Sequence, residues 1–276
     1  MSRRIWLCAD DYGISPGVNR AIRELIENGR LNATSAMVLG PAIGRDEVNA
    51  LKDVASANAR CAIGLHVTLT APFRPLTMHF RPLEGGLFLS HTTLLRRGLM
   101  GRLDSELITT EVMEQLAAFA DLFGRAPDFV DGHQHAQLFP GVRTAFVAAV
   151  KKAAPEAWIR QCGRDLPWGQ RLDSPKALVL DVLSTQFRAR AARAKLAFNP
   201  AFAGAYDFAQ EPDFGVLMRR FLQGMPEGGV VMCHPGFVDD VLIGLDPLTV
   251  QREREYEFLR GEAFLPLLTT NDVTLG

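Results

Sequence analysis

Residues 4–19 read RIWLCADDYGISPGVN and pass from an apolar run directly to the start of a helix. The run from Arg4 to Ala9 predicts a buried strand. After it, Ser15 can cap a helix that has Pro16 in its first turn and ends at Gly29. A buried strand followed at once by a helix is the repeating unit of a parallel α/β fold.

The same alternation continues along the chain. Further strands are predicted at the apolar runs Ala33 to Leu39, Cys61 to Thr70, Asp128 to Asp131, Ala157 to Gln161, Gly229 to Cys233 and Val273 to Leu275. Helices are expected over residues 16–29, 45–59, 94–124, 141–153, 174–198, 213–223 and 247–260. About seven parallel strands covered by helices are therefore expected, in one domain over residues 1–276. The pattern alone does not separate an open doubly wound sheet from a barrel.

Composition and length exclude several classes of protein. The chain has 276 residues, of which 47% are hydrophobic and 22% charged, as in ordinary globular proteins. Its 30 basic and 31 acidic residues leave a net charge of −1, so the basic surplus of a nucleic-acid binder is missing. No uncharged stretch approaches the roughly 18 residues of a membrane span. The apolar run meets Asp10 too early for a signal peptide, and we expect a cytoplasmic protein.

The remaining sequence signals are weaker. Cys8, Cys61, Cys162 and Cys233 are not spaced as C-x-x-C, and they are expected to be buried, reduced thiols. The glycine patterns of nucleotide-binding sheets are absent from the sequence. Residues 71–93 hold three prolines and predict a surface loop, which could form a lid or a contact in a homo-oligomer. The basic stretch RARAARAK, residues 188–195, is expected to be a solvated helix face, with contact to an anionic lipid or phosphate as the alternative.

Polar residues gather where the predicted strands end. They are Asp10, Asp11, His66, Asp131, His133, His135, Arg160 and His234. Taken singly, each has a structural explanation, such as a turn former or a buried histidine with a partner. In a parallel α/β fold, however, the carboxyl ends of the strands share one face, so these side chains are expected to converge. His133 and His135 are two residues apart, which on a strand would put both on one side.

This set of residues has the composition of a hydrolytic metal site. Two imidazoles and one carboxylate can bind a metal and leave positions vacant for other ligands. A second carboxylate can take a proton from an attacking water, and a further histidine can protonate a leaving group. The same ligand types also serve Fe(II) oxygenases, but those sites usually lie in all-β folds, which the alternation here disfavours.

At these residues the sequence resembles the YdjC-like, or ChbG/HpnK-type, carbohydrate deacetylases. The matching segments are 9–19 (ADDYGISPGVN), 34–38 (TSAMV), 64–70 (GLHVTLT), 123–127 (FGRAP), 131–135 (DGHQH) and 232–237 (MCHPGF). They span most of the chain. Tyr12 stands where the family more often has Phe, and Gln137 where a further histidine is frequent. The resemblance implies a distorted (β/α) barrel, related to the NodB-type polysaccharide deacetylases, that acts on N-acetylated sugars.

The resemblance also implies roles for individual residues. One divalent metal ion, magnesium or zinc, would be held by Asp11, His66 and His133. Asp10 would be the general base and His234 the acid. The substrate would be contacted by His135, by Arg160 (which would also orient Asp10) and by the aromatic loop from Phe202 to Phe208, with Phe202 and Tyr206 as its contacts.

The sequence therefore predicts an enzyme that removes the acetyl group of an N-acetylated sugar. The substrate would be a small carbohydrate, such as an oligosaccharide containing N-acetylglucosamine, or a glycolipid. Two other functions stay open at this point. One is a metal-dependent esterase or phosphoesterase on the same site, and the other is a sugar-binding protein without catalytic activity.

Overall fold

The computed structural model describes residues 2–57, 61–164, 175–208 and 213–275. A seven-stranded parallel sheet has the strand order β6-β5-β4-β3-β2-β8-β7. Its strands are β2 (Trp6–Tyr12), β3 (Ala33–Ala36), β4 (Ala62–Val67), β5 (Phe129–Gly132), β6 (Trp158–Ile159), β7 (Phe202–Ala203) and β8 (Val230–Cys233). The terminal strands β1 (Arg3–Arg4) and β9 (Val273–Thr274) pair with each other in a separate two-stranded sheet.

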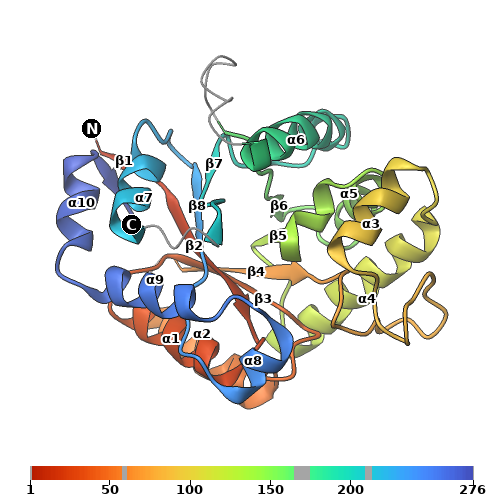
Figure 1. Ribbon diagram of the computed structural model, residues 1–276, viewed down its shortest axis with the longest axis horizontal. Helices are drawn as coiled ribbons and strands as arrows, with labels where there is room; N and C mark the ends of the chain where they lie inside the picture. Colours follow the sequence, from red (N-terminus) through yellow and green to blue (C-terminus); the bar gives the residue numbers. More distant parts are fainter. Residues whose placement is uncertain (1, 58–60, 165–174, 209–212, 276) are drawn as a thin grey trace.

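The helices surround the curled sheet (Figure 1). They are α1 (Pro16–Glu27), α2 (Arg45–Ala57), α3 (His91–Leu99), α4 (Ser105–Phe123), the 3₁₀ helix η1 (His133–Leu138), α5 (Val142–Ala153), α6 (Pro175–Arg193), α7 (Phe214–Leu222), α8 (Asp240–Leu245), α9 (Val250–Arg260) and α10 (Phe264–Thr270). Figure 1 shows α3, α4 and α5 on the right of the sheet, and α1, α2, α9 and α10 to the left and below. Within the described ranges, every helix is too short or too polar to cross a membrane.

The first helix forms for the reasons that its sequence suggests. The Ser15 side chain accepts a hydrogen bond from the Val18 N–H at 3.2 Å, and Pro16 occupies the first helical position, where no N–H is needed. Apolar residues spaced three and four apart are buried on one face, namely Val18, Ala21, Ile22, Leu25 and Ile26. Burial of this face against the sheet fixes the turn that joins β2 to α1.

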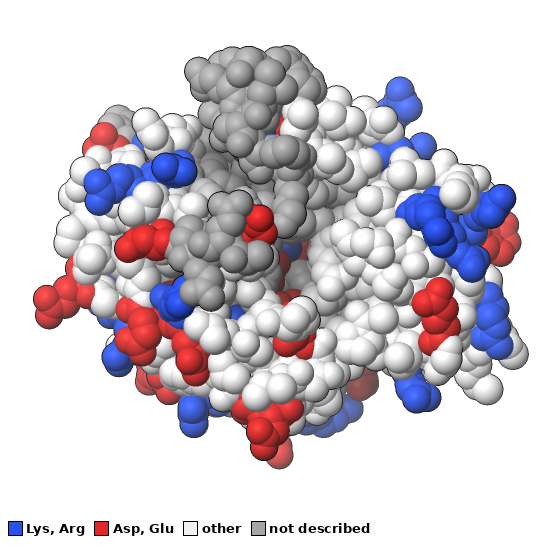
Figure 2. All heavy atoms as spheres, in the orientation of Figure 1, with Lys and Arg blue, Asp and Glu red and all other residues white. Residues whose placement is uncertain are grey.

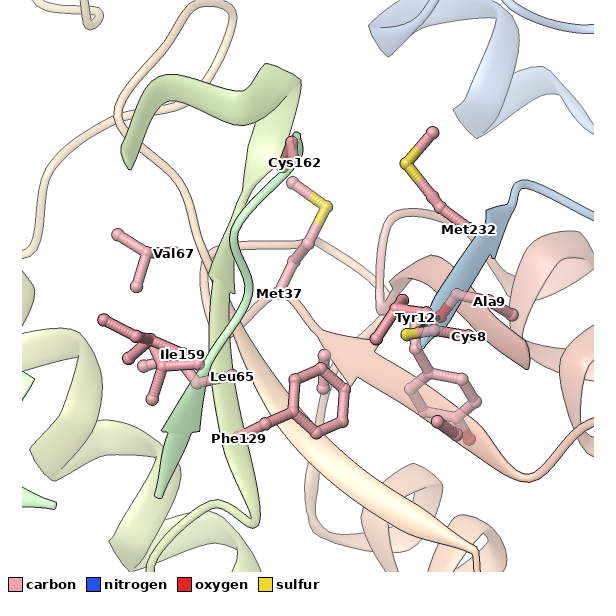
Figure 3. Close-up of a cluster of buried hydrophobic side chains, with 14 of the residues drawn as sticks. Cys8, Ala9, Tyr12, Met37, Leu65, Val67, Phe129, Ile159, Cys162 and Met232 are labelled. Atoms are coloured by element: carbon pink, nitrogen blue, oxygen red, sulfur yellow. Dashed lines mark hydrogen bonds between the residues drawn. The ribbon is translucent and has the colours of Figure 1, made fainter. Parts of the chain in front are cut away.

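The two-residue period of the strands sorts side chains between the barrel interior and the helices. Figure 3 shows Leu65, Val67 and Ile159 together on one side of the strands and Phe129 on the other. Trp158 stacks on Trp6 and on Phe129, with ring centroids 6.2 and 4.5 Å apart. Side chains alternate along a strand, so the residues two positions after these aromatic residues also face the barrel interior. The interior therefore has a polar layer next to the aromatic layer, nearer the carboxyl ends of the strands.

Residues 197–203 close the curled sheet by joining its two edge strands. The Ile159 N–H donates to the Ala197 carbonyl at 2.9 Å, and β7, at the end of this segment, pairs with β8. Between these points the side chain of Asn199 takes the place of a backbone pair: Oδ1 accepts from the Gln161 N–H at 2.9 Å, and Nδ2 donates to the Gln161 carbonyl at 3.1 Å. The predicted distorted barrel is thus confirmed.

Two element predictions were wrong in detail. The strand expected at Val273 to Leu275 is present, but it pairs with β1 outside the main sheet, and β7 supplies the seventh strand instead. With two residues, β7 is too short to show an alternating pattern. The helix expected over residues 94–124 is divided into α3 and α4, because Gly101 adopts a φ of 66° and the Asp104 side chain caps α4.

The cysteine and basic-stretch predictions can be compared directly with the structure. Cys8, Cys162 and Cys233 are buried free thiols, whereas Cys61 is half-buried. Burial raises the pKa of Cys162 to about 12, so its thiol is protonated at neutral pH. Arg190, Arg193 and Lys195 are exposed, as both the solvated face and the alternative contact with an anionic lipid or phosphate require.

Replacing Asn199 by Leu should lower the free energy of unfolding by at least about 2 kcal/mol, because both backbone groups of Gln161 would be buried without partners. Chemical denaturation would measure this loss. The matched control is Asn28→Leu, which removes an exposed side-chain bond to the Glu24 carbonyl and should change stability by no more than about 0.5 kcal/mol. Equal losses in the two variants would show that Asn199 does not close the barrel.

Candidate functional site

The carboxyl end of β2 contains a β-bulge that turns two adjacent aspartates into the site. Ala9 pairs with Thr34 and Tyr12 with Ala36, so Asp10 and Asp11 together stand opposite the single residue between Thr34 and Ala36. On a regular strand, neighbouring side chains point to opposite faces. Here Asp11 has a left-handed φ of 68°, and this backbone conformation lets both carboxylates face the interior.

Asp11 meets two histidines at the candidate metal site. Its Oδ1 lies 3.2 Å from His66 Nε2 and 3.0 Å from His133 Nδ1. Candidate ligand atoms of these three buried residues all lie within 4.8 Å of one another. His66 comes from β4 and His133 from the start of η1, directly after β5. The structure therefore brings together the three residues that the family resemblance implied as metal ligands.

The ring of His66 is held by partners on its other nitrogen. Asp131 Oδ1 lies 2.6 Å from His66 Nδ1, and Ser35 Oγ lies 3.0 Å from the same atom. His66 and Asp131 are direct partners in the β4–β5 register, which explains the close approach. Hydrogen bonding at Nδ1 leaves Nε2 directed at Asp11, as in metal sites whose histidine ligands are oriented by a carboxylate.

Asp10 is bound by the fully buried guanidinium of Arg160. The Arg160 side chain donates to both carboxylate oxygens of Asp10, each at 2.6 Å, and its Nη1 lies 3.1 Å from Asp131 Oδ2. Burial alone would raise the pKa of Asp10, but the positive charge of Arg160 lowers it to about 2. Asp10 is therefore an ionised carboxylate at neutral pH, in one fixed orientation.

The buried aspartates of the cluster outnumber its guanidiniums by one. Three buried aspartates, Asp10, Asp11 and Asp131, face the two buried guanidiniums of Arg160 and Arg252. Burial would lower the pKa of His66, yet Asp131 and Asp10 raise it to about 10. The raised pKa of His66 reflects a negative electrostatic potential, and such a potential also favours a metal cation among Asp11, His66 and His133. The nearby group of Cys8, Asp10 and Asp131 already has a positive charge beside it, that of Arg160.

The two histidines of DGHQH diverge, contrary to the expectation for a strand. They lie in η1, where Gln134 and His135 have left-handed φ angles of 54° and 56°. His133 turns towards Asp11, whereas His135 Nδ1 lies 3.5 Å from Cys162 Sγ and its ring meets the edge of Phe202. Burial, followed by the charge of Arg160, lowers the pKa of His135 to about 3, so this imidazole is neutral at pH 7.

His234 lies beside Asp10 at the end of the neighbouring strand. Ala9 is paired with Cys233, so the two residues that follow them, Asp10 and His234, end adjacent strands. The backbone N–H of His234 donates to Glu255 Oε2 at 2.6 Å, and this bond fixes the loop after β8. Its Nδ1 is buried and has no hydrogen-bond partner among the residues that the structure describes.

The side chains that were predicted to contact the substrate differ in how deeply they are buried. Phe202 is buried in β7, with its ring beneath Arg160 at 5.8 Å. Tyr206 is half-buried, and its hydroxyl donates to Glu255 Oε1 at 2.6 Å. Gln137 does not reach the metal ligands but packs against β6, where Nε2 donates to the Arg160 carbonyl at 3.2 Å. Contact of these aromatic residues with a sugar stays a prediction.

The loop at 71–90 borders the candidate metal site. Phe73 packs edge-on against His133, with ring centroids 5.8 Å apart. The buried carboxylate of Glu111 accepts hydrogen bonds from the N–H groups of Leu76 and Thr77, at 3.1 and 2.9 Å, and so ties the loop to α4. Figure 2 shows a hollow over the middle of the molecule with acidic atoms at its bottom.

Two residues of the site were missed by the sequence analysis, Arg252 and Glu255 on α9. Both are fully buried, although the stretch VQREREYEFLR looks like a solvated helix. The signal was in their spacing: they share a helix face with Tyr256 and Leu259, which are apolar and buried. Charged residues on an apolar face indicate buried partners.

Comparisons with known proteins agree with this architecture. A family model described as YdjC-like protein matches residues 4–270. A structure from Enterococcus faecalis V583, provisionally described as a cellobiose-phosphate cleavage protein, has 20% identity and a TM-score of 0.75, with 100% of this chain and 97% of that chain covered. The lactam utilization protein of Thermus thermophilus has 15% identity and a TM-score of 0.56, with 99% and 98% covered. These likenesses show a shared fold.

Replacing Arg160 by Met should lower the free energy of unfolding by about 3–5 kcal/mol at pH 7, because Asp10 and Asp131 would lose their buried counter-charge. In the native protein, the depressed pKa of Asp10 adds stability above pH 4 that is lost as the pH falls towards 2. In the variant, burial would raise that pKa instead. The stability difference between the two proteins should therefore shrink from pH 7 to pH 5, as urea unfolding would show.

The control is Arg125→Met, which breaks an ion pair with Asp128 whose side chains are both 40% exposed. That pair should contribute no more than about 1 kcal/mol. A loss for Arg160→Met that matches the control, or that is the same at both pH values, would contradict the buried-charge account.

Proposed function

The chain belongs to the YdjC-like protein family, and we propose that it is a metal-dependent deacetylase of an N-acetylated carbohydrate. One observation carries the proposal: the ligand atoms of Asp11, His66 and His133 converge within 4.8 Å, and the residue before Asp11 is a second carboxylate, held ionised by Arg160. A cation-binding group and a base are thus adjacent in the chain and in space. Metal-assisted amide hydrolysis uses both.

The donor set fits a divalent cation. Two imidazoles and one carboxylate are the ligands of many hydrolytic zinc sites, whereas magnesium prefers oxygen donors and water. The negative charge of the surrounding aspartates favours either ion. When bound, such a cation would act as a Lewis acid that polarises the acetyl carbonyl and lowers the pKa of a water molecule.

The side chains of the protein would carry out the proton transfers. Asp10 takes a proton from the attacking water, whose oxygen bonds to the carbonyl carbon of the acetamido group. Arg160 keeps Asp10 ionised and correctly oriented for this step. His234 donates a proton to the amide nitrogen as the C–N bond breaks, which releases acetate and a free amino sugar.

We propose a small carbohydrate that contains N-acetylglucosamine, or a glycolipid, as the substrate. His135 and Tyr206 would contact the sugar. The buried side chains of Phe202 and Arg160 would support this part of the site. Because one structure of this fold is provisionally linked to a phosphorylated disaccharide, phosphorylated sugars belong among the candidates.

Acetate release from N-acetylated mono- and disaccharides, with and without phosphate, tests the proposal directly. The protein is stripped with a chelator and then reloaded with zinc, magnesium, manganese or cobalt. Release that disappears on stripping and returns with metal is the expected result. Release only from acetyl esters or phosphate esters would point instead to an esterase or phosphoesterase, and sugar binding without any release would point to a binding protein.

Two variants separate the proposed role of the base from that of a metal ligand. Asp10→Asn should retain metal and lower turnover by about 10²- to 10⁴-fold, because the base is lost while the ligands remain. His66→Ala should lose metal, which mass spectrometry of the bound ion would show. Unchanged turnover in Asp10→Asn would remove this residue from the role of base.

A further inference from the structure

Arg252 contacts the candidate metal site from behind. Its side chain is fully buried, and Nη2 donates to Asp11 Oδ2 at 2.6 Å and to Asp246 Oδ2 at 2.7 Å. Its Nε donates to the Leu248 carbonyl at 3.0 Å, and its own carbonyl accepts from the Gly236 N–H at 3.1 Å. The guanidinium is therefore fixed by the protein itself, on the side of Asp11 that faces away from the histidines.

The two oxygens of Asp11 consequently have separate partners. Oδ2 is bound to Arg252, while Oδ1 faces His66 and His133. An unrestrained carboxylate could rotate and offer either oxygen, or both, to a cation. Asp11 also lies on a left-handed backbone within the β-bulge. The bond to Arg252 therefore fixes which oxygen faces the ligand group.

We propose that Arg252 is a positioning residue for metal binding, which holds Asp11 so that one oxygen alone serves as a ligand. This inference rests on the proposed function, because it assumes that Asp11, His66 and His133 bind the metal. The charge of a guanidinium opposes a nearby cation, so Arg252 also has an unfavourable effect. Asp246 balances that charge, and the orienting effect is therefore expected to dominate.

Zinc affinity of the chelator-stripped protein, measured by competition with a chromophoric chelator, tests this role without any assay of turnover. Arg252→Met should weaken zinc binding about 10- to 100-fold, as loss of partners behind metal ligands generally does. Arg252→Lys retains the positive charge but has a single donor nitrogen, and its zinc affinity should fall between those of Arg252→Met and the native protein. The matched control is Arg260→Met on the same helix, which breaks an exposed pair with Glu257 and should leave zinc affinity unchanged.

The outcomes separate this inference from the proposed function. Absence of zinc binding by the native protein would overturn the metal site itself. Native binding with equal or tighter binding by Arg252→Met would overturn the positioning role and leave the metal site intact. If near-UV circular dichroism shows that Arg252→Met does not fold, Arg252→Lys and Asp246→Asn decide. The first replaces the planar guanidinium by an ammonium group, and the second weakens a bond that holds the guanidinium in place. Weaker zinc binding in both supports the role, and unchanged affinity in either overturns it.

Discussion

The bulge at Asp10 and Asp11 is the constraint on which the rest of the site depends. A regular parallel strand would send one of these carboxylates into the barrel and the other towards the helices. The irregular register opposite β3, with the left-handed backbone of Asp11, lets both face the interior at the carboxyl end of the sheet. In the proposed reaction, this arrangement would let adjacent residues serve as a metal ligand and as a base.

Buried arginines keep those purposes apart. Two carboxylates next to each other in the chain would otherwise share one cation or one proton. Arg160 binds both oxygens of Asp10 and leaves it ionised, whereas Arg252 binds a single oxygen of Asp11 and leaves the other facing the histidines. Asp131, between His66 and Arg160, connects the two halves of the cluster. The roles proposed for Asp10 and Asp11 thus follow from their different salt bridges within the barrel.

The sequence predicted the parts of the site that lie at strand ends. Asp10, Asp11, His66, His133 and His234 converge because parallel strands end at one face, and this can be read from apolar runs followed by polar residues. The divergence of His135 from His133 could not be predicted, since it depends on two left-handed residues in η1. Arg252 was hidden in a charge-rich helix, and β7 was too short to have a pattern.

The most direct test of a metal centre at Asp11, His66 and His133 is anomalous X-ray diffraction from crystals of the protein soaked in zinc. We expect one strong anomalous peak enclosed by these three side chains, with Arg160 still bound to Asp10. A peak among Cys8, Asp10 and Asp131 would contradict this account of the site, as would the lack of any peak near Asp11 at saturating zinc.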